Sequence, residues 1–380
     1  MPAKLKPLAQ QVIVITGASS GIGLATARKA AKAGAAVVLA SRNETALKAI
    51  AEEINAAGGR AHAVSGDVGD PADVEKIARA AIARFGGFDT WINDAGVGVY
   101  AELENLPPED HERLFRTNYF GVVNGSLEAV KHLKTRRDGG AIINIGSVLS
   151  EVAVPLLGAY AASKHAVKGF TDALRVELTR DKAPISVTLI KPSSVSSPFP
   201  DHARNYMDEA PRVPPPVYAP EVVADAILHA AQHPVRHVTV GSGGRQMVLL
   251  GGGAPRLADK VFAAAIPRFA KRKGEKPTRD NLYEAGVDGR VHTDAYGGRK
   301  FSVYTAAQKH SGLTLGLGAL ALLGAAAYLG RGQIARTARP LAARVARPMV
   351  ARGVRRNPRE AMRLAVRHPR QALRLAGSLR

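Results

Sequence analysis

The chain has 380 residues, of which 46% are hydrophobic and none is cysteine. This length exceeds one ordinary domain, so a main domain with an appendage is expected. The lack of cysteine excludes disulfides, thiolate metal sites and cysteine nucleophiles, and no other metal site is predicted. No secretory signal is predicted, because the first 11 residues carry Lys4 and Lys6 and lead directly into a strand pattern.

The net charge of +21 is concentrated at the C-terminal end. Residues 331–380 contain 14 arginines, no lysine and one acidic residue, Glu360, which gives this tail a charge of +13. The preceding 330 residues carry only +8. Basicity is therefore mainly a property of the tail, and it says little about the rest of the chain.

Strand and helix patterns alternate from Gln11 to about Gly241. Alanine-rich amphipathic stretches such as 22–33 and 44–57 separate apolar runs at Val12–Thr16, Ala36–Ala40, Ala61–Ser65, Phe88–Asn93, Ala141–Gly146, Ile185–Lys191 and His237–Gly241. Alternation of this kind predicts an α/β fold with a doubly wound, Rossmann-type parallel sheet of seven strands. The nearly continuous apolar runs are typical of strands covered on both faces.

Composition divides the chain into four parts. Residues 1–241 form the predicted Rossmann domain, in which the proline-rich stretch 197–220 suits a loop over a cleft. Residues 242–310 mix an apolar helical stretch with a glycine-rich, charged one, and no chemistry is assigned to them. Residues 311–330 are uncharged and apolar, and residues 331–380 form the arginine-rich tail.

A glycine-rich turn follows the first predicted strand and leads directly into a helix. In this turn, Gly17 permits a tight bend, Gly21 lets the backbone approach a pyrophosphate, and Gly23 allows close helix packing. The helix N-terminal amides then bind the anion. Because strand, turn and helix occur in order, we interpret the segment as a dinucleotide site rather than an ordinary glycine turn.

The end of the second strand indicates which nicotinamide cofactor binds. An acidic residue there would bind the adenosine ribose and repel a 2′-phosphate. The chain has Ser41 and Arg42 instead, which can donate a hydrogen bond to that phosphate and pair with it. The alternative is that Arg42 only caps a surface loop, but the missing acid favours NADP(H).

Four polar residues further along form a candidate catalytic set. Tyr160 and Lys164 stand at i and i+4 on one helix face, where their side chains can meet. Ser147 ends a predicted strand 13 residues before Tyr160, and Asn118 lies in the helical stretch before that strand. Each feature alone is common, but their order behind a dinucleotide turn is not.

With these motifs the chain resembles the classical short-chain dehydrogenase/reductase family over roughly residues 10–241. The resemblance implies a homodimer or homotetramer in which the Asn118 and Tyr160 helices pack across an interface. It also implies that Asp67 and Val68 flank the adenine. The cofactor-binding residues it implies are Gly17, Ser19, Ser20, Gly21, Ile22, Gly23, Ser41, Arg42, Asp67, Val68, Asn93, Ala95, Gly96, Tyr160, Lys164, Pro192 and Val195. Two positions depart from the family pattern: Asp94 replaces an asparagine and Ser193 replaces a glycine.

The expected mechanism follows from charge. A phenol with a pKa near ~10 is a poor acid or base at neutral pH, and a nearby ammonium lowers that pKa. Lys164 would supply the ammonium and, as in the family, hold the nicotinamide ribose. Ser147 would donate to the substrate oxygen, and Asn118 would fix a water in a proton relay. Tyr160 would then protonate a carbonyl oxygen as hydride reaches its carbon.

The apolar segment 311–330 has about the length needed to cross ~30 Å of hydrocarbon. The alternative is a helix buried against the catalytic domain. In the tail, residues 357–367 are echoed by 368–376, and Arg359, Arg363 and Arg367 form a basic ridge beside an apolar face. Basic amphipathic helices are typical of membrane surfaces. A solvated tail is a further alternative.

Charge and cofactor together restrict the topology. The positive-inside rule keeps the tail cytoplasmic, and NADPH keeps the catalytic domain there too, so one clean crossing does not satisfy both. We therefore expect a cytoplasmic catalytic domain attached to the membrane by an interfacial or re-entrant segment. Nucleic acid is a less favoured partner, because the tail has no aromatic residue for base stacking.

The sequence thus predicts a membrane-associated carbonyl reductase or alcohol dehydrogenase that acts on a small lipophilic molecule. One alternative is a non-catalytic NADP(H)-binding regulator, which would not need the intact set Ser147, Tyr160 and Lys164. Another is a nucleic-acid-associated protein that binds through its tail.

Overall fold

The computed structural model describes residues 3–274 and 279–309, which belong to one compact unit. The predicted apolar segment at 311–330 and the arginine-rich tail at 331–380 lie outside the described residues. Within the described ranges, no helix is both long enough and apolar enough to cross a membrane.

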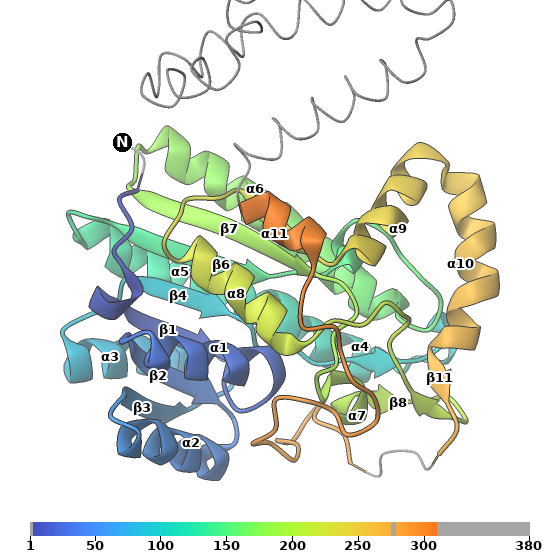
Figure 1. Ribbon diagram of the computed structural model, residues 1–380, viewed down its shortest axis with the longest axis horizontal. Helices are drawn as coiled ribbons and strands as arrows, with labels where there is room; N and C mark the ends of the chain where they lie inside the picture. Colours follow the sequence, from blue (N-terminus) through green and yellow to red (C-terminus); the bar gives the residue numbers. More distant parts are fainter. Residues whose placement is uncertain (1–2, 275–278, 310–380) are drawn as a thin grey trace, which may run out of the picture. The chain divides into compact units, whose positions relative to one another are not determined.

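The centre of this unit is a parallel sheet of seven strands, as the sequence predicts (Figure 1). In spatial order the strands are β10 (His237–Val240), β7 (Ile185–Pro192), β6 (Gly140–Ile145), β4 (Thr90–Asn93), β1 (Val12–Thr16), β2 (Ala36–Ser41) and β3 (Arg60–Ser65). The chain winds from β1 through β2 to β3 and then crosses back to β4 on the other side of β1. The carboxyl ends of β1 and β4 therefore form a topological switch point, where ligands of such sheets bind.

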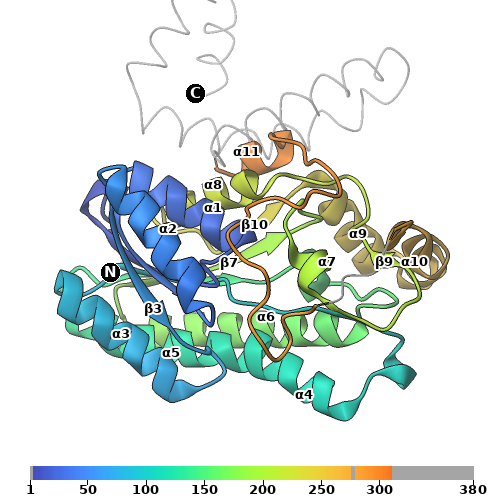
Figure 2. The same cartoon turned by 90° about the horizontal axis from the view of Figure 1, so that it is seen from below.

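Helices cover both faces of the sheet, which confirms the doubly wound fold (Figures 1 and 2). One layer consists of α1 (Gly21–Lys32), α2 (Glu44–Ala56) and α8 (Pro220–Ala230), and the other of α3 (Pro71–Phe85), α5 (Gly121–Thr135) and α6 (Gly158–Arg180). Side chains alternate between these layers along each strand. In β1, Ile13 and Ile15 face the first layer and Val14 the second, all fully buried. Each such side chain contributes about 1.5–3 kcal/mol through its burial.

Shorter elements decorate the carboxyl edge of the sheet. They are β5 (Val99–Tyr100), η2 (Leu103–Asn105), α4 (Pro108–Phe115), the π-helical turn η3 (Arg116–Phe120), η4 (Val148–Ser150), α7 (Phe199–His202), β8 (Arg204–Asn205) and β9 (Ala210–Pro211), whereas η1 (Leu8–Gln10) precedes β1 at its amino end. The proline-rich stretch 197–220 contains three of them and closes one side of the cleft, as predicted.

A buried polar network connects β4 and β6 to the second helix layer. The Asn93 amide donates to the Asn144 side chain at 2.8 Å and to the Ser126 hydroxyl at 3.1 Å, and Asn144 donates to Thr171 at 3.0 Å. These side chains are almost completely buried, so each polar group needs a partner. Asn93 therefore connects β4 to β6 and to α5.

The segment from 242 onward, to which the sequence assigns no chemistry, packs on the Rossmann domain. It contains α9 (Ser242–Gly253), α10 (Pro255–Phe269), β11 (Lys271–Arg272), a long irregular stretch and α11 (Val303–Lys309). In α11, the Gln308 amide group donates to Thr239 O at 2.7 Å and accepts from Thr239 N at 3.2 Å. This contact satisfies open backbone groups of β10, the strand at one edge of the sheet.

Candidate active site

The glycine-rich turn lies at the switch point between β1 and β4. Gly17 has a φ of +71°, and a Cβ there would lie 2.7 Å from Ala95 N. A Cβ on Gly23 would lie 2.2 Å from Gly17 O. A side chain at either position would push apart the turn after β1, the start of α1 and the segment after β4. The two glycines therefore allow the start of α1 to lie against the end of β4. A nicotinamide dinucleotide fits such a cradle, because its pyrophosphate needs close backbone approach.

The first amides of α1 have several partners. Gly21 N donates to Arg290 O at 2.9 Å, and Gly23 N donates to the Asp94 carboxylate. The family's usual asparagine is thus replaced by a group that can carry a negative charge next to the cradle. The sequence shows this replacement, but only the structure shows what the carboxylate faces.

The predicted adenosine end brings together Arg42, Asp67 and Val68 in the pocket wall. Asp67 accepts a hydrogen bond from Arg113 at 2.6 Å, and together with the Gly69 amide this interaction lowers its pKa although burial opposes the shift. Arg42 is part-buried, which lowers its pKa, and its guanidinium donates to backbone carbonyls of residues 281–283. Arg42 thus lines the pocket while its guanidinium holds the irregular segment 281–283.

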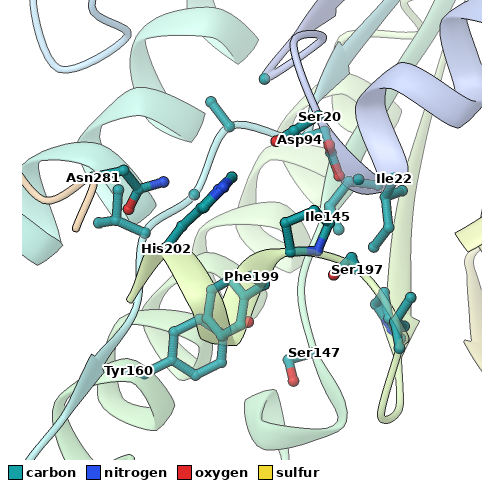
Figure 3. Close-up of a pocket in the computed structure, with 18 of the residues that line it drawn as sticks. Ser20, Ile22, Asp94, Ile145, Ser147, Tyr160, Ser197, Phe199, His202 and Asn281 are labelled. Carbon is teal, nitrogen blue, oxygen red and sulfur yellow. The ribbon is translucent and has the colours of Figure 1, made fainter. Parts of the chain in front are cut away.

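Ser147, Tyr160 and Lys164 all line the same pocket, and Figure 3 shows Ser147 and Tyr160 in it. Lys164 Nζ donates to Ile145 O at 2.9 Å and lies 5.6 Å from the Tyr160 ring centroid. Ser147 Oγ accepts from Leu149 N at 3.1 Å as the cap of η4. Its own proton is left to donate, toward Tyr160 or toward a substrate oxygen.

Burial dominates the electrostatics of this group. It raises the pKa of Tyr160, as does the Asp94 charge, whereas the hydrogen bond with Ser147 lowers it. Burial also lowers the pKa of Lys164 to about 8, and Asp94 opposes that shift. The pKa of Asp94 is in turn raised to about 7 by burial, despite the Lys164 charge and the Gly23 amide. In water these three groups titrate outside the physiological range. Here their pKa values are shifted, and the Asp94 charge acts on both of the others.

Asn118 lies behind the catalytic group, in the π-helical turn between α4 and α5. Its Oδ1 accepts from Val97 N at 2.8 Å, and its Nδ2 donates to Val97 O at 3.0 Å and to Ser163 Oγ at 3.2 Å. The side chain is fully buried and braces the bend after Gly96. A Cβ on Gly96 would lie 3.4 Å from Asn118 Oδ1 and 3.8 Å from Lys164 Nζ, so this bend faces both residues.

The remaining walls of the catalytic end are mostly apolar. Phe199 of α7 packs against Tyr160, with 5.3 Å between ring centroids. Further apolar lining comes from the η4 region and from the C-terminal helices, in the residues Leu149, Val154, Leu157, Met247, Ile266 and Ala270. Arg212 and His202 are polar exceptions: Arg212 Nε and His202 Nε2 are buried without a hydrogen-bond partner among the described residues, and burial lowers the pKa of His202.

Most residues implied by the sequence line one continuous pocket, and three do not. Gly23 is in the packing contact with Gly17, while Asn93 and Asn118 support the site from behind. Sequence reasoning missed the C-terminal contributors, Met247, Ile266, Ala270, Asn281, Gly286 and Asp288, and also Phe199 and His202. No local motif marks them, because they reach the pocket only through long-range packing.

Fold and site together define a nicotinamide-dependent oxidoreductase. The family model for short chain dehydrogenases matches residues 11–207. A Bacillus subtilis relative described as the uncharacterized oxidoreductase YxnA is 44% identical over 286 residues, which cover 74% of this chain and 80% of that protein. The chain belongs to the classical short-chain dehydrogenase/reductase family.

Solved structures of the family have the same fold. A Burkholderia phymatum short-chain dehydrogenase/reductase in complex with NAD matches with a TM-score of 0.61 at 27% identity, over 67% of this chain and 97% of that one. A Thermococcus sibiricus alcohol dehydrogenase complexed with 5-hydroxy-NADP matches with a TM-score of 0.53 at 27% identity, over 60% and 95%. Both cofactor types therefore occur among the neighbours.

We predict that Asp94→Asn stabilises the cofactor-free protein at pH 8 but not at pH 4. The pKa of this carboxyl rises from 3.8 to about 7 on folding, so the folded state loses stability as pH increases across that interval. Above pH 7 the folded protein bears the full free-energy cost of the buried Asp94 charge. Allowing for partial solvent access, removing the charge should gain on the order of 1–2 kcal/mol.

Thermal unfolding at both pH values measures this difference, with the exposed Asp138→Asn as the matched control. If Asp94→Asn changed the melting temperature equally at pH 4 and pH 8, the raised pKa of Asp94 would be wrong.

Proposed function

We propose that the protein is an NADP(H)-dependent oxidoreductase that interconverts a carbonyl and an alcohol, with Tyr160 as general acid and base. The observation that carries this proposal is the shared pocket. One cavity extends from the glycine cradle at Gly17 to Ser147, Tyr160 and Lys164. A cofactor bound on the cradle would therefore present its reactive ring to the proton-transfer residues.

Each side chain has a distinct task in this reaction. Bound NADPH supplies a hydride to the carbonyl carbon. Tyr160 donates its phenolic proton to the carbonyl oxygen, and burial suits this role because it keeps the free phenol protonated. The Lys164 ammonium stabilises the phenolate that results, and the Ser147 hydroxyl donates to the substrate oxygen as charge develops.

Asn118 supports these residues without reaching the substrate. Because both its amide atoms are bonded to Val97, it holds the chain segment that faces Lys164. We propose that it positions Lys164 and the relay that restores the Tyr160 proton.

Two features support NADP(H) over NAD(H). β2 ends with Ser41, which is followed by Arg42, so no acidic side chain follows the strand to bind the ribose hydroxyls. Arg42 lines the pocket beside Asp67 and Val68, where a 2′-phosphate on the adenosine would lie. Arg113 also lies near Arg42, but its charge is paired with Asp67, and Asp288 brings a further carboxylate close to Arg42.

The apolar walls around Tyr160 support a lipophilic substrate. Phe199 packs on Tyr160, and Met247 and Ile266 share an apolar cluster with Tyr160, while Arg212 adds a charged group to the same pocket. A carbonyl or alcohol on an apolar skeleton would gain binding energy by burying that skeleton.

We also propose that residues 311–380 attach the protein to a membrane surface. The support is compositional: 20 uncharged residues precede a tail with a charge of +13. Attachment would bring the pocket near lipophilic substrates, and anionic lipid adds about 1 kcal/mol per arginine near the surface. The homodimer or homotetramer stays a prediction from the family.

Tyr160→Phe should reduce turnover by a factor of about 10²–10⁴, because the ring remains but no proton can be transferred. A screen of aldehydes, ketones and alcohols for NADPH consumption or formation identifies the substrate for this measurement. Tyr304→Phe is a control outside the pocket, because Tyr304 lies in α11 and does not line the cavity. Near wild-type turnover in the Tyr160 variant would exclude the assignment.

Arg42→Ala should weaken NADPH binding by about 1.5–3 kcal/mol, which is tenfold or more, and NADH binding much less. The reason is that only NADPH carries the 2′-phosphate. Dissociation constants for both cofactors, measured by titration calorimetry, provide the comparison. If both affinities fall equally, the phosphate pairing is wrong.

Two truncations test the membrane proposal. A chain that ends at Gly330 lacks only the arginine-rich tail, and one that ends at Lys309 also lacks the apolar segment. We expect stepwise loss of co-sedimentation with anionic vesicles, because the charge is removed first and the apolar anchor second. Unchanged sedimentation of the shorter chain would refute attachment through residues 311–380.

A further inference from the structure

A segment without regular structure, residues 279–290, lies across the adenosine end of the pocket. We call it the strap; in Figure 1 it belongs to the orange coil that passes beside α7. Its anchor is Leu282, which is fully buried in an apolar cluster with Val97, Val99, Ala101, Leu114 and Ala159. An irregular segment is thus held to the domain by a core residue.

Polar contacts hold the strap on both sides of this anchor. Asp280 accepts from Arg204 Nε at 3.0 Å and from Leu282 N at 2.9 Å. The Tyr283 hydroxyl donates to the buried Asp110 at 2.9 Å. The strap therefore has a defined position, and it is not a loop that merely happens to lie near the site.

The strap contacts the cofactor-binding elements directly. Arg42 donates from Nη1 to Tyr283 O at 2.9 Å and to Leu282 O at 3.3 Å, and from Nη2 to Asn281 O. The glycine-rich turn is bonded to it as well, because Gly289 N donates to Ser19 O at 2.8 Å. The strap is thus bonded both to Arg42 and to the glycine-rich turn, which are two different parts of the proposed dinucleotide site.

The strap is a wall of the pocket and does not fill it. Asn281, Gly286 and Asp288 line the same cavity as Arg42 and Asp67, so space remains between the two sides. Asn281 lies beside His202 in this cavity (Figure 3). Its Oδ1 is buried without a partner among the described residues, and such an atom is costly unless a ligand satisfies it.

We propose that the strap is the second half of the adenosine site and holds Arg42 in the orientation that accepts a 2′-phosphate. This inference rests on the proposed function, since it assumes that a nicotinamide dinucleotide binds the cradle. A guanidinium has five N–H donors. The strap carbonyls engage both protons on Nη1 and one on Nη2, which leaves the Nε edge to pair with phosphate.

Coupling between strap and cofactor follows from this arrangement. If Arg42 is oriented by the strap, loosening the strap removes part of the phosphate affinity, and bound NADPH in turn holds the strap closed. NADH lacks the phosphate and should depend on the strap less. Cofactor preference is therefore assigned to the C-terminal segment as well as to the end of β2.

Leu282→Ala tests the inference in the full chain, because it removes the anchor and leaves every polar group of the site in place. Leu133→Ala is the matched control: Leu133 is an equally buried leucine of α5, in the second helix layer. Leu282→Met keeps the apolar anchor. Dissociation constants for NADPH and NADH are measured by calorimetry, and amide hydrogen exchange of residues 280–290 is measured with and without each cofactor.

We expect Leu282→Ala to weaken NADPH binding about tenfold and NADH binding much less, with Leu282→Met near wild type and Leu133→Ala unchanged in preference. In the wild type, NADPH should slow exchange in the strap more than NADH does.

Equal losses for both cofactors, or strap exchange that NADPH leaves unchanged, would overturn the inference while the proposed function stands. If the wild type binds neither cofactor, both fail. If Leu282→Ala does not fold, the exchange data on the wild type decide alone.

Discussion

The close approach of three backbone segments at the switch point is the constraint on which the rest of the structure depends. Gly17 and Gly23 leave no room for a Cβ where the turn after β1 meets the end of β4. That contact aligns the start of α1 with the bend at Gly96, and the bend faces Asn118 and Lys164. The glycine-rich turn and the position of Lys164 are therefore set by the same packing.

Burial then changes the acid–base properties of the side chains in the pocket. Desolvation moves the pKa of Lys164 down and that of Tyr160 up, while Asp94 adds a negative charge that interacts with both. A separate polar network behind β4 and β6 satisfies its own buried groups, because Asn93 donates to Asn144 and Asn144 donates to Thr171. Because aspartate and asparagine have nearly the same shape, the carboxylate at position 94 is mainly an electrostatic change.

The C-terminal segment completes the Rossmann domain. Helices α9 and α10 supply apolar walls at the catalytic end, and the strap supplies polar walls at the adenosine end. α11 satisfies the open backbone of β10 by bonding Gln308 to Thr239. One segment therefore reaches the wall near Tyr160, the wall near Arg42 and the sheet edge, which explains why the family motifs alone leave the pocket incomplete.

Local sequence determined the seven strands, the glycine cradle and the pairing of Tyr160 with Lys164, because periodicity, backbone freedom and helical spacing act over a few residues. The same patterns left residues 242–310 without a role. Only the tertiary structure decided that Arg42 meets carbonyls about 240 positions away, that Asn118 bonds to Val97, and that Met247 and Ile266 line the pocket. Such contacts arise from long-range packing, in which no periodic pattern marks the partner.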